Sequence, residues 1–139
     1  MRILPPPSGS RFEGLGAVKA PSPLEKDVQR SVLLYLEALR IYAAHAPNGS
    51  VLAGDAKARA IQSNALKKAG VKPGFPDLIL IKRDTEGSRV GFFEIKRESG
   101  KLSPEQEAFS DLCTDWRLPF AVVRSVGDAQ TALTQWGWL

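Results

Sequence analysis

Helical spacing of apolar residues marks the first folded segment of the chain. The residues on this stripe are Leu24, Val28, Val32, Tyr35, Leu36 and Leu39. They predict an amphipathic helix with one buried face. Ser22 is suited to cap this helix, Pro23 to occupy its first position, and Glu25 to complete a capping box with Ser22. The helix is therefore expected to end near residue 40.

Strands and helices alternate through the rest of the chain. The polar turn Pro47-Asn48-Gly49 and the helix-ending Gly70 separate the early elements. The predicted strands are 41–45, 77–82, 89–97 and 119–124. The predicted later helices are 55–69, 104–116 and 125–138. Residues 77–97 form a hairpin that is apolar on nearly every strand position, so both its faces should be covered. The pattern predicts an α/β fold with a small mixed sheet flanked by helices.

Composition narrows the class of protein without naming a function. Residues 1–21 are rich in Pro, Gly and Ser and are expected to form a flexible arm ahead of one domain over 22–139. No apolar run could span a bilayer, no secretory signal is evident, and a lone Cys113 excludes an internal disulfide. The expected compartment is therefore the cytoplasm. A net charge of +4 permits a polyanionic partner but does not require one.

Asp77, Glu94 and Lys96 are the residues of the hairpin best suited to chemistry. Glu94 and Lys96 are two positions apart on one strand, so they share a face, and hairpin pairing can place Asp77 opposite Glu94. Two close carboxylates raise each other's pKa, and Mg²⁺ relieves that conflict. Such an ion activates water, while Lys96 can hold the water or stabilise a charged transition state. The alternative is that Asp77 is a turn residue and that Glu94 and Lys96 alternate on an exposed edge strand.

Five ordered motifs resemble those of the PD-(D/E)xK nucleases, and most closely the virus-type replication-repair nuclease (VRR-NUC) group. The motifs are Glu25 with Gln29, Pro47-Asn48-Gly49, Gly74-Phe75-Pro76-Asp77, Glu94-Ile95-Lys96 followed by Gly100, and Ser103-Pro104-Glu105-Gln106. The resemblance covers about residues 22–137, nearly all of the expected domain.

The resemblance implies a restriction-endonuclease-like αβββαβ core. It implies that Asp77, Glu94 and the backbone carbonyl of Ile95 bind Mg²⁺ or Mn²⁺ and that Lys96 is catalytic. Glu25 would project from the first helix toward the metal, directly or through water. Stand-alone members resemble phage and bacterial proteins that form homodimers similar to Holliday-junction resolvases. A homodimer acting on DNA in a bacterial or phage-infected cell is the corresponding expectation.

Several polar residues near these motifs have both a structural and a functional interpretation. Glu25 could serve only the capping box, but Gln29 shares its helix face, which capping does not explain. Gln106 could cap its helix, orient a site ligand or contact DNA. His45 could contact phosphate or be a partly buried strand residue, and Asn48 could contact the substrate or only hold its turn.

Basic residues provide candidate phosphate contacts, and Arg97 and Lys101 are favoured because they flank the proposed site. The other candidates, most of which are expected to be solvated, are Lys57, Arg59, Lys67, Lys68, Lys72 and Arg124. The three tryptophans at helix ends are expected in a core or a dimer interface rather than under bases.

The predicted function is metal-dependent hydrolysis of DNA by an endonuclease. No helix-turn-helix or zinc finger for base readout is evident, so structure-selective cutting fits better than sequence-specific cutting. A four-way junction is the favoured substrate. Three alternatives stay open: a non-catalytic DNA-binding module of the same fold, a nuclease for RNA or single strands, and an interaction protein that binds no metal.

Overall fold

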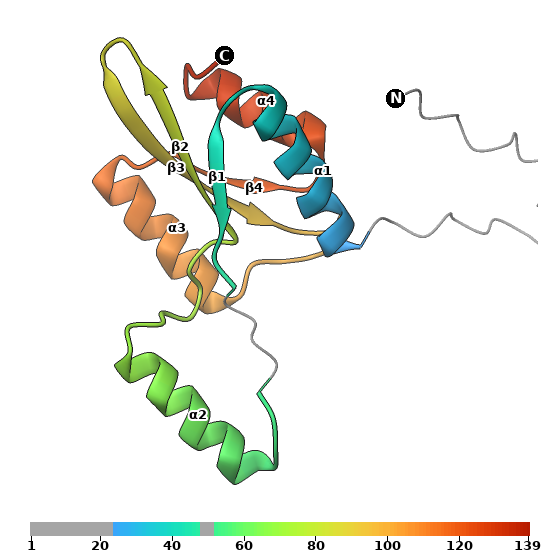
Figure 1. The fold of residues 1–139 in the computed structure, drawn as a ribbon, viewed down its shortest axis with the longest axis vertical. Helices are drawn as coiled ribbons and strands as arrows, with labels where there is room; N and C mark the ends of the chain where they lie inside the picture. The colour runs from blue at the N-terminus through green and yellow to red at the C-terminus, as the bar shows by residue number, and fades with distance from the viewer. Residues whose placement is uncertain (1–23, 48–51) are drawn as a thin grey trace, which may run out of the picture.

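The computed structural model describes residues 24–47 and 52–139, in which helices and strands follow the predicted order (Figure 1). The helices are α1 Glu25–Ala38, α2 Ala56–Lys68, α3 Pro104–Trp116 and α4 Val126–Gln135. The strands are β1 Tyr42–His45, β2 Leu78–Asp84, β3 Gly87–Ile95 and β4 Phe120–Val123. Apart from α2 and α4, the order is αβββαβ, so the predicted core is confirmed. No helix in these two ranges is long and apolar enough to cross a membrane.

The four strands form one mixed sheet in the order β1-β2-β3-β4. β1 and β3 each pair antiparallel with β2, and β4 pairs parallel with β3. The parallel pair requires a crossover, and α3 supplies it (Figure 1). The predicted mixed sheet flanked by helices is therefore confirmed.

Helices cover both faces of the sheet. Alternate residues of β3 point to opposite faces, and Phe93 and Ile95 enter the main core with α1 and α4. The helical side of this core comprises Val28, Val32, Leu36, Ala129, Ala132 and Leu133. Gly91 lies beneath Trp136, whose ring would be 2.8 Å from a Cβ at that position. A glycine there lets the indole ring pack directly on the sheet.

The other face of the sheet packs on α3 through aromatic rings. Phe92 of β3 and Phe109 of α3 meet edge to face with ring centroids 5.3 Å apart. Phe75, from the loop before β2, contacts both rings at 6.0 and 5.4 Å. This cluster fixes the loop that leads into β2 against the sheet and α3.

The hairpin is covered on both faces only along half of its length. In β3 the five residues from Gly91 to Ile95 are buried, whereas the first four residues are exposed. The hairpin tip extends past the helices (Figure 1). The expectation of full coverage was wrong for this outer half, where Ile81 and Val90 stay exposed.

The start and end of two helices differ from the sequence expectation. α1 has Leu24 as its N-cap, in an extended conformation and without a side-chain cap. The backbone carbonyl of Leu24 accepts the first helical hydrogen bonds, from Asp27 and Val28. Glu25 is therefore the first residue of the helix, where Pro23 was expected to be. Ser22 and Pro23, the other members of the expected capping arrangement, lie outside the described residues. α4 ends at Gln135 because Gly137, at φ +73°, turns Trp138 back into the core.

Helix α2 stands apart from the rest of the molecule (Figure 1). Its last residue is Lys68, its C-cap is Ala69, and Gly70 follows at φ +97°, the left-handed conformation predicted for it. None of its residues is buried, and in the described part of the chain it packs against no other helix or strand.

Cys113 is buried, as expected. Of the tryptophans expected in a core or a dimer interface, Trp138 is buried in the core, whereas Trp116 is 69% exposed at the end of α3.

Candidate active site

Hairpin register brings the two carboxylates Asp77 and Glu94 together. Leu78 pairs with Phe93, so the next positions along the two strands are Asp77 and Glu94. The Asp77 carboxylate accepts a hydrogen bond from the backbone N–H of Ile95 at 2.7 Å. Asp77 is thereby fastened to the strand that carries Glu94, which holds both carboxylates at one end of the hairpin.

Glu94 is the only buried charged residue in the described chain, with 2% of its surface exposed. Its Oε1 accepts a hydrogen bond from Gln106 Nε2 at 2.8 Å and lies 3.8 Å from Lys96 Nζ. Its Oε2 has no hydrogen-bond partner among the described residues. A buried carboxylate oxygen without a hydrogen-bond partner costs free energy. The alternative that Glu94 lies exposed on an edge strand is wrong.

The surroundings of Glu94 disfavour its charged form. Burial is the largest cause, followed by the negative charge of Asp77, and together they raise the pKa of Glu94 to about 8. Lys96 opposes this shift and Glu25 adds to it. A divalent cation at this position would reverse the balance, because it stabilises the deprotonated carboxylates.

A pocket opens beside these carboxylates. It is lined by Glu25, Pro73, Gly74, Phe75, Asp77, Glu94, Ser103, Glu105 and Gln106. The sequence reasoning did not single out Glu105 as a site residue. Glu105 lies in the first turn of α3, next to the capping residues Ser103 and Gln106. That position in the sequence could have indicated it. The acidic lining comes from separate parts of the chain and meets only in the folded protein.

The backbone at Gly74, in the wall of this pocket, lies in close contact with the start of α3. Its φ is +82°, and a Cβ at this position would lie 2.4 Å from the backbone carbonyl carbon and oxygen of Glu105. Both observations exclude a larger side chain without movement of the backbone. The loop that precedes Asp77 is therefore positioned by direct backbone contact with α3.

Gln106 has two of the functions considered for it. Its Oε1 accepts the N–H of Ser103 at 2.8 Å while Ser103 Oγ accepts the N–H of Gln106 at 3.2 Å, so the predicted capping box is confirmed. Its Nε2 meanwhile donates to Glu94. One amide group thus starts α3 and orients the buried carboxylate.

Gln106→Glu is expected to keep the helix cap and weaken divalent-cation binding. Glutamate can accept the Ser103 N–H in the same capping box, but it lacks the N–H donor that orients Glu94. The dissociation constant for Mg²⁺, measured by calorimetry, should rise about 10-fold or more. Ser103→Ala is the matched control, which should cost about 1 kcal/mol of stability and leave Mg²⁺ affinity nearly unchanged. Equal Mg²⁺ affinity in Gln106→Glu and the wild type would contradict this assignment.

Glu25 and Gln29, the two site residues predicted on the first helix, differ in their position relative to the pocket. Glu25 is the first residue of α1, is exposed, and lines the pocket. Because Leu24 caps the helix, the capping box no longer explains Glu25. Gln29 lies one turn further on, half-buried, and does not line the pocket.

His45 and Asn48 have different outcomes. His45 Nδ1 is 2.9 Å from the backbone carbonyl oxygen of Asp77. A carbonyl only accepts, so Nδ1 carries the donated proton. Ala46 N–H donates to the same oxygen, and β1 therefore supports the backbone of a site residue. Asn48 lies outside the described residues.

Arg97 and Lys101 are exposed in the segment that follows β3. Arg124, a candidate phosphate contact in the sequence, has another function. Its Nη1 donates to the carbonyl oxygens of Arg97 at 2.8 Å and Gly100 at 2.7 Å. This guanidinium holds the segment that carries the two exposed basic residues.

The donors present suit a hard cation with an incomplete protein shell. The described residues contain no cluster of three or more His, Cys, Asp or Glu side chains arranged to hold a metal ion. Two carboxylates, Asp77 and Glu94, with water and a substrate phosphate match the usual surroundings of Mg²⁺. The unpartnered Oε2 of Glu94 is a ready oxygen ligand. The residues at the site therefore fit such an ion.

Comparison with protein families matches the VRR-NUC domain over residues 26–127. No curated protein and no solved structure matches the chain. The matched range includes most of α1, both hairpin strands, the crossover helix α3 and β4. It therefore contains Asp77, Glu94, Lys96 and Gln106. The chain belongs to the VRR-NUC domain family of PD-(D/E)xK-type nucleases.

Proposed function

We propose that this protein is an endonuclease that hydrolyses phosphodiester bonds in DNA with the help of Mg²⁺ or Mn²⁺. The buried, unpartnered Oε2 of Glu94 beside Asp77 carries the proposal. Natural proteins rarely leave a buried carboxylate oxygen without a partner unless it has a ligand or a chemical function. A divalent cation would balance the negative charges of Glu94 and Asp77 and give Oε2 a partner.

Each site residue has a distinct function in this proposal. Asp77 and Glu94 hold the cation, with the Ile95 backbone carbonyl as a further oxygen ligand and Glu25 acting directly or through water. The cation would lower the pKa of a water molecule and stabilise negative charge on the phosphate. Lys96 Nζ, near Glu94 Oε1, holds the attacking water or stabilises the charge that develops on the phosphate. Gln106 orients Glu94.

The proposed substrate is a branched DNA such as a four-way junction, cut during replication, recombination or repair. The described elements form one sheet with flanking helices. None of them is a separate motif for contacting base edges in a DNA groove. A homodimer would place two sites on two strands of a junction. The setting would be the cytoplasm of a bacterial or phage-infected cell.

Cleavage of a labelled substrate panel tests the proposal. The panel comprises linear duplex, single strand, flap, splayed arm and four-way junction, each with Mg²⁺, Mn²⁺ or EDTA. The wild type should cut a branched substrate only with a divalent cation. Asp77→Asn should abolish cutting while keeping its acceptor for the Ile95 N–H, so its melting temperature should stay close to that of the wild type.

Other outcomes of the panel point to specific alternatives. Tight DNA binding without cutting under any condition would support a non-catalytic binding module. Preferential cutting of RNA or of single strands would replace the branched-DNA substrate. Cutting that persists in EDTA or in Asp77→Asn would overturn the proposed site.

A further inference from the structure

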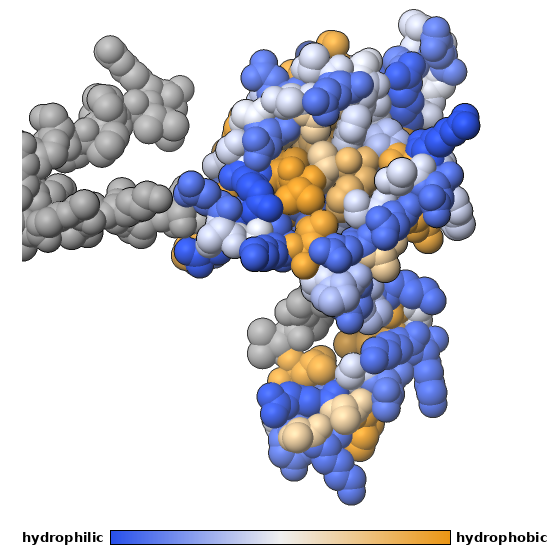
Figure 2. All heavy atoms as spheres, turned by 180° about the vertical axis from the view of Figure 1, so that it is seen from behind, coloured by the Kyte–Doolittle hydropathy of each residue, from blue (hydrophilic) through white to orange (hydrophobic). Residues whose placement is uncertain are grey.

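Helix α2 and the loop after it have no structural explanation in the folded core. α2 buries none of its side chains and packs against no other described helix or strand. Figure 2 shows it as a separate lobe whose surface carries hydrophilic side chains with hydrophobic patches between them. A helix that buries nothing gains no stability from the core, so its position relative to the core must be explained otherwise.

Positive charge is concentrated in this lobe. Residues 55–72 contain five Lys and Arg residues and a single Asp, a net charge of +4. That equals the net charge of the whole chain, so the remaining residues are neutral in sum. The contrast with α3 is sharp, because the sequence of α3 has four acidic residues and no basic one. The lobe thus carries as much net positive charge as the whole chain.

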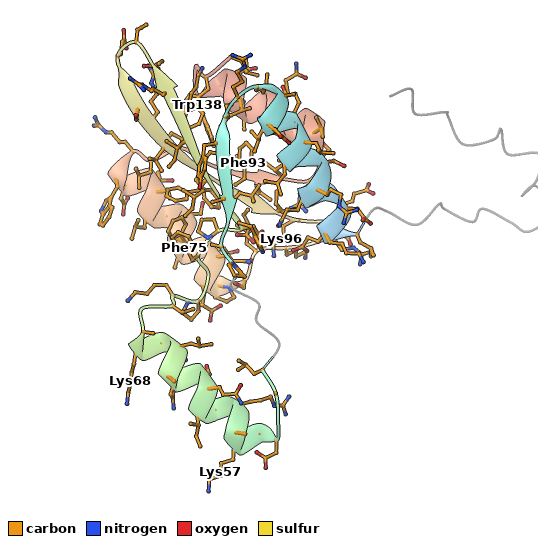
Figure 3. The ribbon with its side chains drawn as sticks, in the orientation of Figure 1. Lys57, Lys68, Phe75, Phe93, Lys96 and Trp138 are labelled. Carbon is orange, nitrogen blue, oxygen red and sulfur yellow. The ribbon has the colours of Figure 1, made fainter. Side chains whose placement is uncertain are left out.

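The basic side chains have a spacing suited to a line of phosphates. Lys57 and Lys68 are eleven positions apart, which is about three helical turns, so they lie on one face about 16 Å apart. Figure 3 shows both side chains pointing away from the rest of the molecule. A DNA strand advances about 3.4 Å per phosphate along the helix axis. The two lysines can therefore reach phosphates about five nucleotides apart.

The lobe is joined directly to the wall of the active site. From the end of α2 the chain runs through Lys72 to Pro73 and Gly74, and the latter two line the pocket with Asp77 and Glu94. The carboxylates in that pocket repel an approaching polyanion. Basic groups on an adjoining segment compensate for this repulsion and bring the phosphate backbone to the pocket.

We propose that α2 is a phosphate-binding arm that grips the DNA backbone beside the scissile bond, through Lys57 and Lys68 with support from Arg59, Lys67 and Lys72. This inference rests on the proposed nuclease function and adds to it the element that holds the substrate. The arm contacts phosphates only, so it contributes affinity and no sequence preference.

Segments next to α2 in the chain contact its apolar side. Leu66 shares a pocket with Leu52 and Val71, which belong to the segments on either side of the helix. Gln62 Nε2 donates to the carbonyl oxygen of Ala53 at 2.7 Å, which ties the helix to the preceding segment. The chain around α2 thus covers only part of its apolar side, since Leu66 is 37% and Ile61 61% exposed. The side chains of Lys57 and Lys68 point to solvent (Figure 3).

The double variant Lys57→Ala/Lys68→Ala tests the arm. Alanine favours the helix, and the N-cap of α2 is formed by Asp55 rather than by either lysine. Binding of the full-length protein to a labelled duplex of about 30 base pairs is measured in EDTA over a range of salt. The slope of log affinity against log salt should decrease by about 1.8, since each phosphate that is no longer neutralised accounts for about 0.9. KM for cleavage should rise about 10-fold, with kcat unchanged.

A charge-matched control distinguishes the arm from net charge. Arg83→Ala/Arg89→Ala removes two basic groups near the hairpin tip, at the opposite end of the molecule (Figure 1). It should retain nearly the wild-type salt slope and KM. Equal slopes in the two double variants would overturn the arm, even if the wild type cuts DNA normally.

Two further results separate the arm from the proposed function and from a protein interface. A wild type that binds duplex with the expected salt slope but cuts nothing would reject the nuclease and leave the arm intact. Sedimentation velocity of Lys57→Ala/Lys68→Ala should match the wild type. A change in its oligomeric state would show that α2 contacts another copy, through a surface such as acidic α3, and would overturn the arm.

Discussion

Lys96→Ala is expected to lower the single-turnover rate of DNA cleavage by about 10²–10³-fold, the usual effect of removing one transition-state donor. Lys96 is well placed for such a function, because only 12% of its side chain is exposed and its Nζ is 3.8 Å from Glu94 Oε1. Its loss also removes the one charge that lowers the pKa of Glu94. DNA affinity should change only a few-fold, since a partly buried lysine contributes little to binding along the backbone.

Two further variants serve as controls for Lys96→Ala. Lys101→Ala removes an exposed lysine five residues away that is a candidate phosphate contact. With DNA fully bound, it should leave the single-turnover rate within a few-fold of the wild type. Lys96→Arg keeps the charge but changes its shape, and should recover only part of the rate. If Lys96→Ala cut at the wild-type rate and only melted at a lower temperature, Lys96 would be a structural partner of Glu94.

Without a divalent cation, the free energy of unfolding is expected to fall as the pH rises from about 5 to 8. The pKa of Glu94 is about 8 in the folded protein, well above its ordinary value of 4.5. Between these values the native state keeps a proton that the unfolded state has released, so raising the pH favours unfolding. The melting temperature in EDTA should drop by at least about 5 °C across this range.

Glu94→Gln should remove most of this pH dependence. The amide is neutral at every pH, so the native and unfolded states no longer differ in proton binding at this position. If Glu94→Gln loses as much stability as the wild type over the same rise in pH, another group is responsible.

Mg²⁺ should act in the opposite direction to the pH rise. At about pH 8 it should restore several degrees of melting temperature to the wild type, because it binds the deprotonated carboxylates of the native state. At about pH 5 its effect should be small, since protons compete for the same oxygens. Neither effect should occur in Glu94→Gln, and a Mg²⁺ shift there equal to that of the wild type would place the ion elsewhere.

The sequence predicted those parts of the structure that depend on neighbouring residues. The capping box of Ser103 and Gln106 lies within three residues, and its prediction was confirmed. The meeting of Asp77 with Glu94 followed from the period of two in strands and from hairpin pairing of the two strands. The structure adds a turn tighter than the expected loop, with Asp84 paired to Gly87. The fold class followed from the alternation of helical and strand periods.

Contacts between residues far apart in the chain were harder to predict, and orienting a site ligand was only one of three interpretations left open for Gln106. Gln106 reaches Glu94 twelve positions away, and Arg124 reaches carbonyl groups 24 to 27 positions away. Residue type alone does not indicate such partners. The start of α1 was missed for another reason, because Ser22 offers a side-chain cap and the helix instead begins from the Leu24 carbonyl. The isolation of α2 depends on where the core elements pack, which no local pattern encodes.

The parallel pairing of β3 with β4 has a consequence for the order in which the protein is made. Asp77, Glu94 and Lys96 leave the ribosome on one hairpin, but the backbone N–H of Lys96 donates to Val123, and the segment after it is held by Arg124. The hairpin strand therefore acquires its last partner only after residue 124 has been synthesised. An unfinished chain carries all three of these side chains without the support that holds them in place, so the complete site belongs to the finished protein.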